Sequence, residues 1–493
     1  MNKRHCFLNR SIAVFGLLAS AVTLLNAQNP PTGAPETNAL LQNLLSEMRD
    51  LKVAVTDMRG QLEESRRDTQ QLRKELDAAR QQMEALRGSS GVAAPTPSIA
   101  NLVEEQQLLN AKVSDQYQTK VESGSKFRVR LSGMALFNMS STHGSVNDID
   151  LPETAQAPTA GDSRGNFSAT LRQSTIGLEV FGPDLAGAKT SGDVHFDFFG
   201  GFPASSNGVT SGLVRLRTAK IRLDWERTSL TAGQENLFFS PLNPTSFAST
   251  AYPALGSAGN LWTWTPQVYA EHRLPVSNQF TLLLQGGILD PLSGETSGEY
   301  ERQPGSGERG RLPAVAVRTA LQKSRSESTF QIGAAGYYAK HDHGFGRNAD
   351  AWAAMLDWAL PLGRRVALSG EFYRGRSITG LGGSPGGNAL LALPPLDAAG
   401  GWAQLKLKAT DRLEFNAAFG EGYVFRPGLN RLLADRPIDG SPENRNASGF
   451  VNAIYRFRSN LVFSTEYRRL WTSRFNLPLQ RAGHITLSGG IIF

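Results

Sequence analysis

The 493-residue sequence carries 51 Lys and Arg residues against 44 Asp and Glu residues, a formal net charge of +7. This mild basicity without clustered basic patches argues against nucleic-acid binding. The single cysteine, Cys6, excludes an internal disulfide framework. No stretch after residue 27 approaches 18 uninterrupted apolar residues, which excludes membrane-spanning helices but not strands that cross a membrane with alternating hydrophobicity.

Residues 1–27 have the organisation of a secretory signal peptide. Basic Lys3, Arg4 and Arg10 precede an apolar run over 12–25, and a small residue, Ala27, ends the segment. The apolar run is short for a bilayer-spanning helix, which needs about 20 residues. We therefore expect export, with Cys6 removed along with the signal, and treat 28–36 as a spacer.

Residues 37–88 predict a parallel α-helical coiled coil in the periplasm. Apolar residues recur with a seven-residue period at Leu41, Leu44, Met48, Leu51, Val55, Met58, Leu62, Leu72, Leu76, Ala79, Met83 and Leu86. In parallel neighbouring helices the flanking residues would pair opposite charges: Glu47 with Lys52, Asp68 with Arg73, and Glu75 with Arg80. A single amphipathic helix is the alternative, and the pattern leaves the number of helices open. A flexible linker over 89–98 and a short helix with a lead-in over 99–126 follow.

Residues 127–493 predict a transmembrane antiparallel β-barrel of about 16 strands. Between 127 and 140 apolar residues such as Val129, Leu131 and Phe137 alternate with mostly polar ones such as Arg128 and Asn138. Sixteen candidate strands follow one another, separated alternately by tight turns and long loops, which is typical of bacterial outer-membrane barrels with both chain ends in the periplasm. A soluble β-sandwich is the competing fold. The fold class is thus all-β, preceded by the coiled coil.

The last strand carries a candidate assembly signal. Ile485, Leu487, Gly489, Ile491 and Phe493 share one face, and the strand ends on the aromatic residue. Such an ending resembles the signal read by the barrel-assembly machinery of bacterial outer membranes. We expect Phe493 to face lipid at the barrel seam.

The segment 240–263, after the fifth strand of the sixteen that we predict, contains no charged residue. In sixteen-stranded porins the loop at this position folds inward and narrows the channel, although a surface loop is the alternative. Charge selectivity would then come from the wall, where residues of inward parity are expected to line the pore. The basic ones are Arg130, Lys220, Arg222, Arg318, Lys406 and Arg468, and the acidic ones are Asp193, Asp197, Glu235, Glu271, Glu371 and Glu466.

No motif supports catalysis, a cofactor or a metal site. Asp193, His195 and Asp197 share one strand face, as a polar pore wall would produce, and the His341-Asp342-His343 triplet is interpreted as a solvated loop rim. Serine-elbow, zinc-helix and phosphate-loop patterns are lacking from the sequence. We therefore expect a protein that is not an enzyme.

Two segments resemble a known family. The stretches SATLRQSTIGLEVFGPDLAGAKTSGDVHFDFFGG and SGLVRLRTAKIRLDWERTSLTAGQENLFFSPLNP, within a chain that combines a signal peptide, a coiled coil and a barrel, are similar to the DcaP-like trimeric porins. The resemblance implies a homotrimer of sixteen-stranded barrels in outer-membrane lipid, with periplasmic N-terminal helices, that passes small organic anions such as dicarboxylates.

Two functions compete on this evidence. The first is a diffusion channel for small hydrophilic solutes with a weak preference for anions. The second is a structural anchor whose coiled coil tethers the membrane to the cell wall or to a periplasmic partner. Sixteen strands favour the channel, because they enclose a wide lumen that an anchor does not need.

Overall fold

The computed structural model describes residues 128–493 except 160, 162, 203–211, 296–300, 326–327, 384–394, 426–441 and 458–459. The predicted signal peptide, coiled coil, linker and short helix lie outside the described residues. Among the described helices, none has the length and apolar character needed to cross a membrane.

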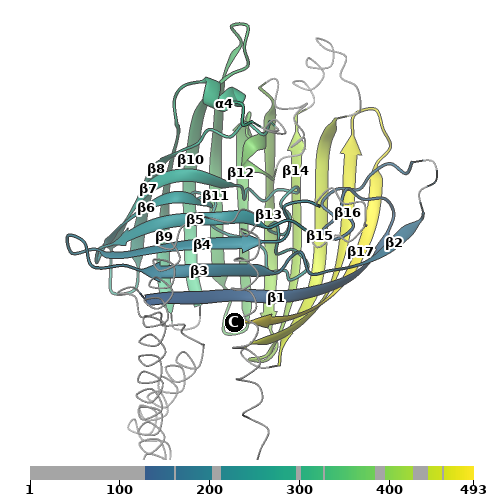
Figure 1. Cartoon of the computed structure of the whole chain (residues 1–493), viewed down its shortest axis with the longest axis horizontal. Coiled ribbons are helices and arrows are strands. Elements are labelled where there is room, and N and C mark those ends of the chain that lie inside the picture. The colour runs from purple at the N-terminus through teal and green to yellow at the C-terminus, as the bar shows by residue number, and fades with distance from the viewer. Residues whose placement is uncertain are drawn as a thin grey trace, which may run out of the picture. The chain divides into compact units, whose positions relative to one another are not determined.

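The described part of the chain is built almost entirely of strands, which Figure 1 shows in chain order. Two short helices, α4 (Ser306–Arg309) and the 3-10 helix η1 (Thr379–Leu381), lie in connections between strands. The strands are β1 (Arg128–His143), β2 (Gly165–Thr170), β3 (Thr175–Phe181), β4 (Lys189–Asp197), β5 (Arg215–Asp224), β6 (Thr228–Asn236), β7 (Trp264–Pro275), β8 (Thr281–Leu289), β9 (Ala314–Arg325), β10 (Ser328–Asp342), β11 (Asn348–Pro361), β12 (Val366–Arg376), β13 (Asp397–Lys408), β14 (Leu413–Val424), β15 (Glu443–Arg456), β16 (Leu461–Arg474) and β17 (Gln480–Ile492).

These strands close into an antiparallel barrel of sixteen. From β3 onward each strand pairs with the next, and β17 pairs with β1. Both β2 and β3 pair with β1, along its second and first halves respectively, so together they form one interrupted strand. The predicted strand number is therefore confirmed.

Alternation along the strands separates an apolar outer face from a polar inner face. In β17, Ile485, Leu487 and Ile491 are about half exposed, whereas Thr486 and Ser488, which alternate with them, are buried. An exposed apolar face backed by a buried polar one is the reverse of a soluble β-sandwich and matches a barrel surrounded by lipid. The backbone of Phe493 exchanges two hydrogen bonds with Gly133 of β1, at 2.8 and 3.0 Å, so the last residue lies at the seam where the barrel closes.

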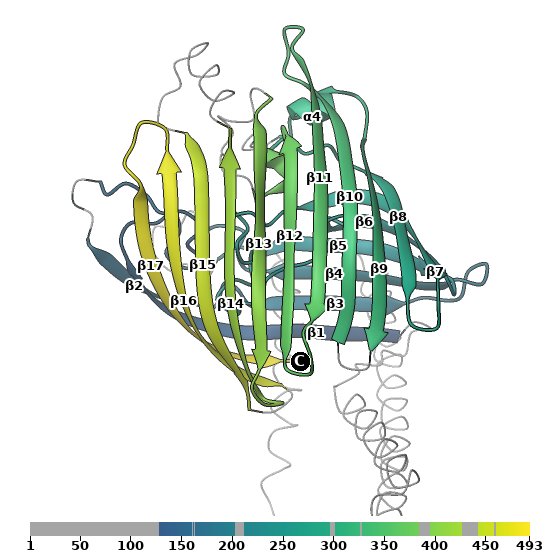
Figure 2. The same cartoon turned by 180° about the vertical axis from the view of Figure 1, so that it is seen from behind.

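The two rims of the barrel differ in the length of their connections. Connections of two to seven residues, at 182–188, 225–227, 276–280, 326–327, 362–365, 409–412 and 457–460, form what we name the turn end. The connections of the loop end have 17 to 27 residues, except 343–347 and 475–479, which have five each. Strand length also varies around the barrel: β2 to β6 have six to ten residues, whereas β9 to β17, side by side in Figure 2, have 11 to 15. The strands β4 to β6 are therefore shorter than β9 to β17, whereas β2 and β3 together span the length of β1.

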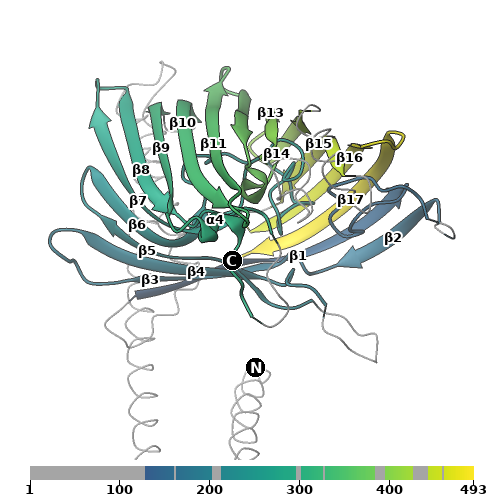
Figure 3. The ribbon, with the colours of Figure 1, turned by 90° about the horizontal axis from the view of Figure 1, so that it is seen from above.

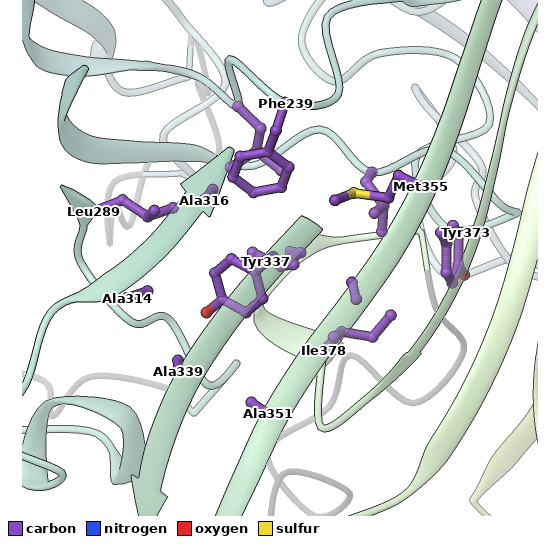
Figure 4. Packing of buried hydrophobic residues seen from close by; sticks show 14 of the residues in the cluster. Phe239, Leu289, Ala314, Ala316, Tyr337, Ala339, Ala351, Met355, Tyr373 and Ile378 are labelled. Carbon is purple, nitrogen blue, oxygen red and sulfur yellow. The ribbon is translucent and has the colours of Figure 1, made fainter. Parts of the chain in front are cut away.

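The interior beside the long strands is filled by an apolar core rather than left open. Seen from above, the strands surround segments that enter the barrel (Figure 3). The core joins 237–239, which follow β6, to inward residues of β7 to β14 and to the segment that contains η1. Phe239 packs on Tyr337 with ring centroids 5.6 Å apart, and Met355 and Ile378 lie beside them (Figure 4). This side of the lumen is therefore occupied by protein.

Candidate functional site

The connection between β6 and β7, residues 237–263, lies inside the barrel and is named the inner loop. It first runs along the long-strand wall, where Glu371 of β12 accepts hydrogen bonds from Ser240 Oγ at 2.6 Å and from the backbone N–H of Leu242 at 2.9 Å. Further along, the Thr245 N–H donates to Gln404 of β13 at 2.6 Å, and Ser246 Oγ donates to Glu466 of β16 at 2.5 Å. The inward folding predicted for this loop is thus observed.

Beyond Ser246 the inner loop continues past β16 to β1 and to the junction between β2 and β3. Ser249 Oγ accepts a 2.8 Å hydrogen bond from Arg468, and the Phe247 carbonyl accepts from Asn138 of β1. Gln173, which is fully buried at the interruption between β2 and β3, donates to the Ala248 carbonyl and accepts from the Thr250 N–H at 2.8 Å. The break in this strand therefore places a side chain that holds the loop.

The inner loop then returns to the long-strand wall through close backbone contacts. The Gly256 carbonyl accepts from the Gly383 N–H at 2.7 Å, and the Gly259 N–H donates to the Gly383 carbonyl at 2.8 Å. Gly259 has a φ of +92°, and a Cβ there would overlap the carbonyl oxygens of Gly401 and Glu421. Only glycine fits this position, because it combines a left-handed conformation with direct contact to the wall.

A second segment, 144–164 between β1 and β2, also packs inward beside the inner loop, which the sequence did not predict. Arg172 binds Asp150 with its Nε at 2.9 Å, Asn446 of β15 donates to the Glu153 carbonyl, and the Ala155 N–H donates to Thr472 of β16. Burial raises the pKa of Glu153 to about 7, although a hydrogen bond with Ser257 and the charge of Arg468 act in the opposite direction. Part of the loop-end opening is therefore covered by this segment as well.

The inner loop and the apolar core cover one group of the predicted pore residues. The Arg318 guanidinium is 2% exposed, binds Asp357 through two hydrogen bonds of 2.8 and 2.9 Å, and donates to Gln285. Arg468 and Glu466 form a buried pair at 2.8 Å, and Glu371 is buried beneath the inner loop. These side chains point inward as predicted, but they are shielded from the lumen and bind protein.

The other group lies on the wall of β3 to β7, which we name the open wall. Lys220 of β5 lies between Asp193 of β4 and Glu235 of β6 and forms an ion pair with each. Arg222 binds Asp224 at 2.7 Å, and Glu271 of β7 binds Arg273 at 2.8 Å. Arg130 of β1 faces Glu179 of β3 at 3.4 Å. The structure therefore brings the predicted basic and acidic residues of this wall together as neighbours.

Our sequence reading omitted several partners in these pairs, although the same alternation would have found them. Arg273, Asp224 and Glu179 share the inward parity of residues that were selected. Glu414 of β14 and Arg456 of β15 also have inward parity and lie at the turn end. Their side chains are 3.1 Å apart, and Lys406 lies 3.9 Å from Glu414. Parity alone does not give the height of a residue along the pore, because registry in a tilted barrel moves residues up or down by several positions.

The cations in these pairs are more exposed than the anions. Side-chain exposure is 59% for Arg130 against 33% for Glu179, and 27% for Lys406 against 8% for Glu414. Arg273 likewise exceeds Glu271. Only the pair of Arg222 and Asp224 is reversed, at 28% against 34%. The lumen therefore meets mainly guanidinium and ammonium groups.

The structure also places the two histidine-containing patterns of the sequence, one in β4 and one at the end of β10. In β4, His195 lies 3.5 Å from Asp193, while Asp197 is fully buried and bound by Arg215 at 2.7 Å. Within the described ranges, no three His, Cys, Asp or Glu side chains are grouped so as to hold a metal ion by themselves. His341 and His343 are only 2% and 8% exposed, so their interpretation as a solvated rim is wrong.

Comparison with solved structures identifies the fold. The outer membrane channel DcaP of Acinetobacter baumannii superposes with a TM-score of 0.58 at 15% identity, covering 76% of this chain and 100% of that one. The fold is that of an outer-membrane channel. The resemblance to DcaP-like porins is therefore confirmed at the level of the fold.

Other similarities are weaker. OprB of Pseudomonas putida gives a TM-score of 0.47 at 11% identity, covering 74% of this chain and 94% of that one. OmpT of Vibrio cholerae gives 0.45 at 8% identity, covering 76% and 100% respectively. No protein-family model and no curated protein matches the sequence.

Proposed function

We propose that this protein is an outer-membrane channel through which small hydrophilic solutes diffuse, with a preference for anions. The observation that carries the proposal is the division of the interior. The inner loop and apolar core fill the side of β9 to β16, while the charged residues of the open wall remain partly exposed. A narrowed lumen beside a polar wall suits diffusion of small solutes.

The preference for anions follows from which charges reach the lumen. Each wall cation has a carboxylate neighbour, so the wall has no large net charge, but the cationic end is the more exposed one in most pairs. The inner loop, which would face these cations, has no acidic residue to counter them. A passing anion therefore meets the more exposed, cationic ends of these pairs first.

Dicarboxylates are the proposed solutes. The two cation groups, Lys220 with Arg222 on β5 and Lys406 with Arg456 at the turn end, belong to different parts of the wall, and a solute with two carboxylates can interact with both in succession. The sequence resemblance to DcaP-like trimeric porins supports the same solute class. No cofactor or catalytic residue is needed for passive transport.

We also propose a homotrimer, with the coiled coil of 37–88 in the periplasm. The wall of β2 to β6 exposes apolar side chains to the outside at Phe167, Leu171, Ile176, Leu178, Leu216 and Ile221. An apolar wall of this kind is suited to packing against identical walls. Phe493 at the seam is proposed to be read by the assembly machinery; its deletion should reduce the heat-modifiable, folded form on gels.

Conductance and reversal potential in a planar bilayer test the channel. We expect stable conductance and, in a KCl gradient, a reversal potential of anion-selective sign. Lys406→Ser and Arg222→Ser should move it towards cations, most at low salt, where screening is weakest. Lys340→Ser on the exposed outer face of β10 removes the same charge outside the lumen and should not move it. A protein that inserts without conducting would instead support the anchor function.

A further inference from the structure

Two histidines at the loop end of β10 form a buried cluster that channel function does not use. His341 is the last inward residue of the alternating series Tyr337, Ala339 and His341, and His343 follows it by two positions. The His343 N–H donates to the Arg347 carbonyl at 2.9 Å, which fixes the chain at the tip of the β10–β11 hairpin. Both imidazoles therefore occupy defined positions on one side of the backbone.

The ring nitrogens lack partners. Nε2 of His341 and both nitrogens of His343 are buried and have no hydrogen-bond partner within the described part of the chain. A buried polar atom without a partner is costly, and native structures rarely keep several together. Three such atoms in neighbouring imidazoles therefore point to a ligand that accepts nitrogen lone pairs.

The spacing of the rings fits a shared metal ion. Their centroids are 6.1 Å apart and their planes lie at 73°. Two imidazoles bound to one Zn²⁺ at about 2.0–2.1 Å have centroids roughly 5 to 6 Å apart, depending on the angle at the metal. A small side-chain adjustment therefore brings one nitrogen of each ring to a common ion.

A carboxylate is held next to the pair. Glu295, in the connection that precedes α4, interacts electrostatically with both imidazoles. It accepts hydrogen bonds from Ser293 Oγ at 2.8 Å and from the Ser306 N–H, and it lies 3.5 Å from Arg309. Arg309 in turn donates to the Asp342 carbonyl, between the two histidines in sequence. The negative charge of Glu295 thus offsets part of the charge of a bound cation.

The side of Glu295 that faces the loop end is open, although both imidazoles are buried. A cavity of about 290 Å³ adjoins Glu295 and is lined by residues of the same connection, including Ser293, Arg302, Gly305 and Glu308. Neither histidine lines this cavity, so waters that complete the coordination of an ion at the imidazoles would enter from it past Glu295. Among the described residues, no third His, Cys, Asp or Glu is grouped with the two imidazoles as a ligand.

We propose that His341 and His343 bind a divalent transition-metal ion, Zn²⁺ by preference among those that imidazole suits, with water completing the coordination. Zn²⁺ accepts imidazole nitrogen and tetrahedral geometry readily. A bound ion would join the β10–β11 hairpin to the connection that carries Glu295 and α4. It would thereby fix these two segments together at the loop end of the channel.

Isothermal titration of tag-free, EDTA-treated protein in detergent with ZnCl₂ tests the site. We expect one Zn²⁺ per chain with a Kd in the micromolar range. His341→Ala and His343→Ala should each weaken binding at least tenfold, and His195→Ala and His272→Ala, which remove histidines elsewhere on the wall, should leave it unchanged. Folding of each variant is checked by its mobility on unheated gels.

A second measurement keeps the test decisive if His341→Ala does not fold. Zn²⁺ should raise the Tm of the wild-type barrel and of His195→Ala, but not that of His343→Ala, whose residue lies beyond the end of β10. Absence of one-per-chain binding to the wild type, or equal binding and equal Tm shifts in His343→Ala, would overturn the proposal. Conductance in EDTA is a separate readout, so failure of the metal site leaves the channel function untouched.

Discussion

Glu371 provides a direct way to release the inner loop. It is buried in β12, and its two carboxylate oxygens accept from Ser240 Oγ and from the Leu242 N–H. Glu371→Ala removes both acceptors and leaves the Leu242 N–H without this partner. A hydrogen bond of this kind contributes about 0.5–1.5 kcal/mol, and a donor left without a partner away from water costs about 1–3 kcal/mol more.

The loss of two such bonds weakens docking of the loop by roughly 3 kcal/mol or more, which raises the population of the released segment about 100-fold. We expect larger single-channel conductance and more current noise in Glu371→Ala, because the released segment no longer holds a fixed position in the lumen. The measurement is single-channel recording in a planar bilayer at constant pH and salt.

Glu371→Gln is the matched control. Its amide oxygen can accept from the Leu242 N–H, while its amide nitrogen donates to Ser240 Oγ, because that hydroxyl can still donate to the Leu261 carbonyl at 3.0 Å. The network is therefore retained in a neutral form, and conductance should stay close to that of the wild type. Equal conductance and noise in Glu371→Ala and Glu371→Gln would refute the assignment of Glu371 as an anchor of the loop.

Three further predictions concern stability, pH and assembly. Arg318→Met should destabilise the barrel by about 3–5 kcal/mol in urea unfolding, because it leaves Asp357 buried and unpaired, and Arg318→Met with Asp357→Leu should recover most of that loss. Burial raises the pKa of Glu153 to about 7, so the contribution of Glu153 to loop docking is fully present below about pH 4.5 and is lost as pH rises through 7. Current noise of the wild type should therefore increase over that range. A noise level that does not change with pH in either the wild type or Glu153→Gln would contradict this prediction. Deletion of 37–88 should still yield trimers in cross-linking, because barrel walls supply most of the contact area, and monomers would show that the coiled coil holds the assembly.

The strands could be predicted from the sequence because the alternation of apolar and polar residues involves only neighbouring positions. Leu131, Phe137, Ile485 and Leu487 alternate with polar neighbours, and burial reproduces those faces. The inner loop was also predictable in outline, from its position among the strands. The sequence could not show which charged wall residues are covered by the inner loop, because contacts such as that of Ser240 with Glu371 join residues 131 positions apart.

The same limit explains the other differences. The interruption between β2 and β3, at Arg172 and Gln173, has no glycine or proline to mark it. The contact that accounts for it joins Gln173 to Thr250, which is again distant in sequence. His341 and His343 have the parity of a polar rim, and only the packing of the connection around α4 buries them. Local alternation thus determines the face of each residue, whereas tertiary packing determines its access to water.

The exposure of wall cations has a general physical cause. Arg and Lys have longer stems than Asp and Glu, so in any ion pair on a wall the cationic end tends to reach further into water. Paired walls in many channels would share this feature, and it does not by itself create anion preference. The distinguishing feature of this chain is an inner loop without acidic residues, which adds no further negative charge opposite the exposed cations.

Asn243→Asp tests whether the neutrality of the inner loop determines selectivity, because it adds a charge by replacing one side-chain nitrogen with oxygen. Asn243 is an exposed residue of the inner loop, and its Oδ1 accepts a 2.9 Å hydrogen bond from Asn260, which an Asp carboxylate can accept equally well. The substitution therefore adds one negative charge to the loop with its geometry retained. We expect the reversal potential in a salt gradient to move towards cations, with the larger change at low salt, where the Debye length is about 30 Å at 0.01 M. Asn278→Asp, in the exposed turn between β7 and β8, adds the same charge at the turn end and should move the reversal potential less. If Asn243→Asp leaves the reversal potential at its wild-type value, the neutrality of the inner loop is not what determines selectivity, and the exposed wall cations must act without regard to it.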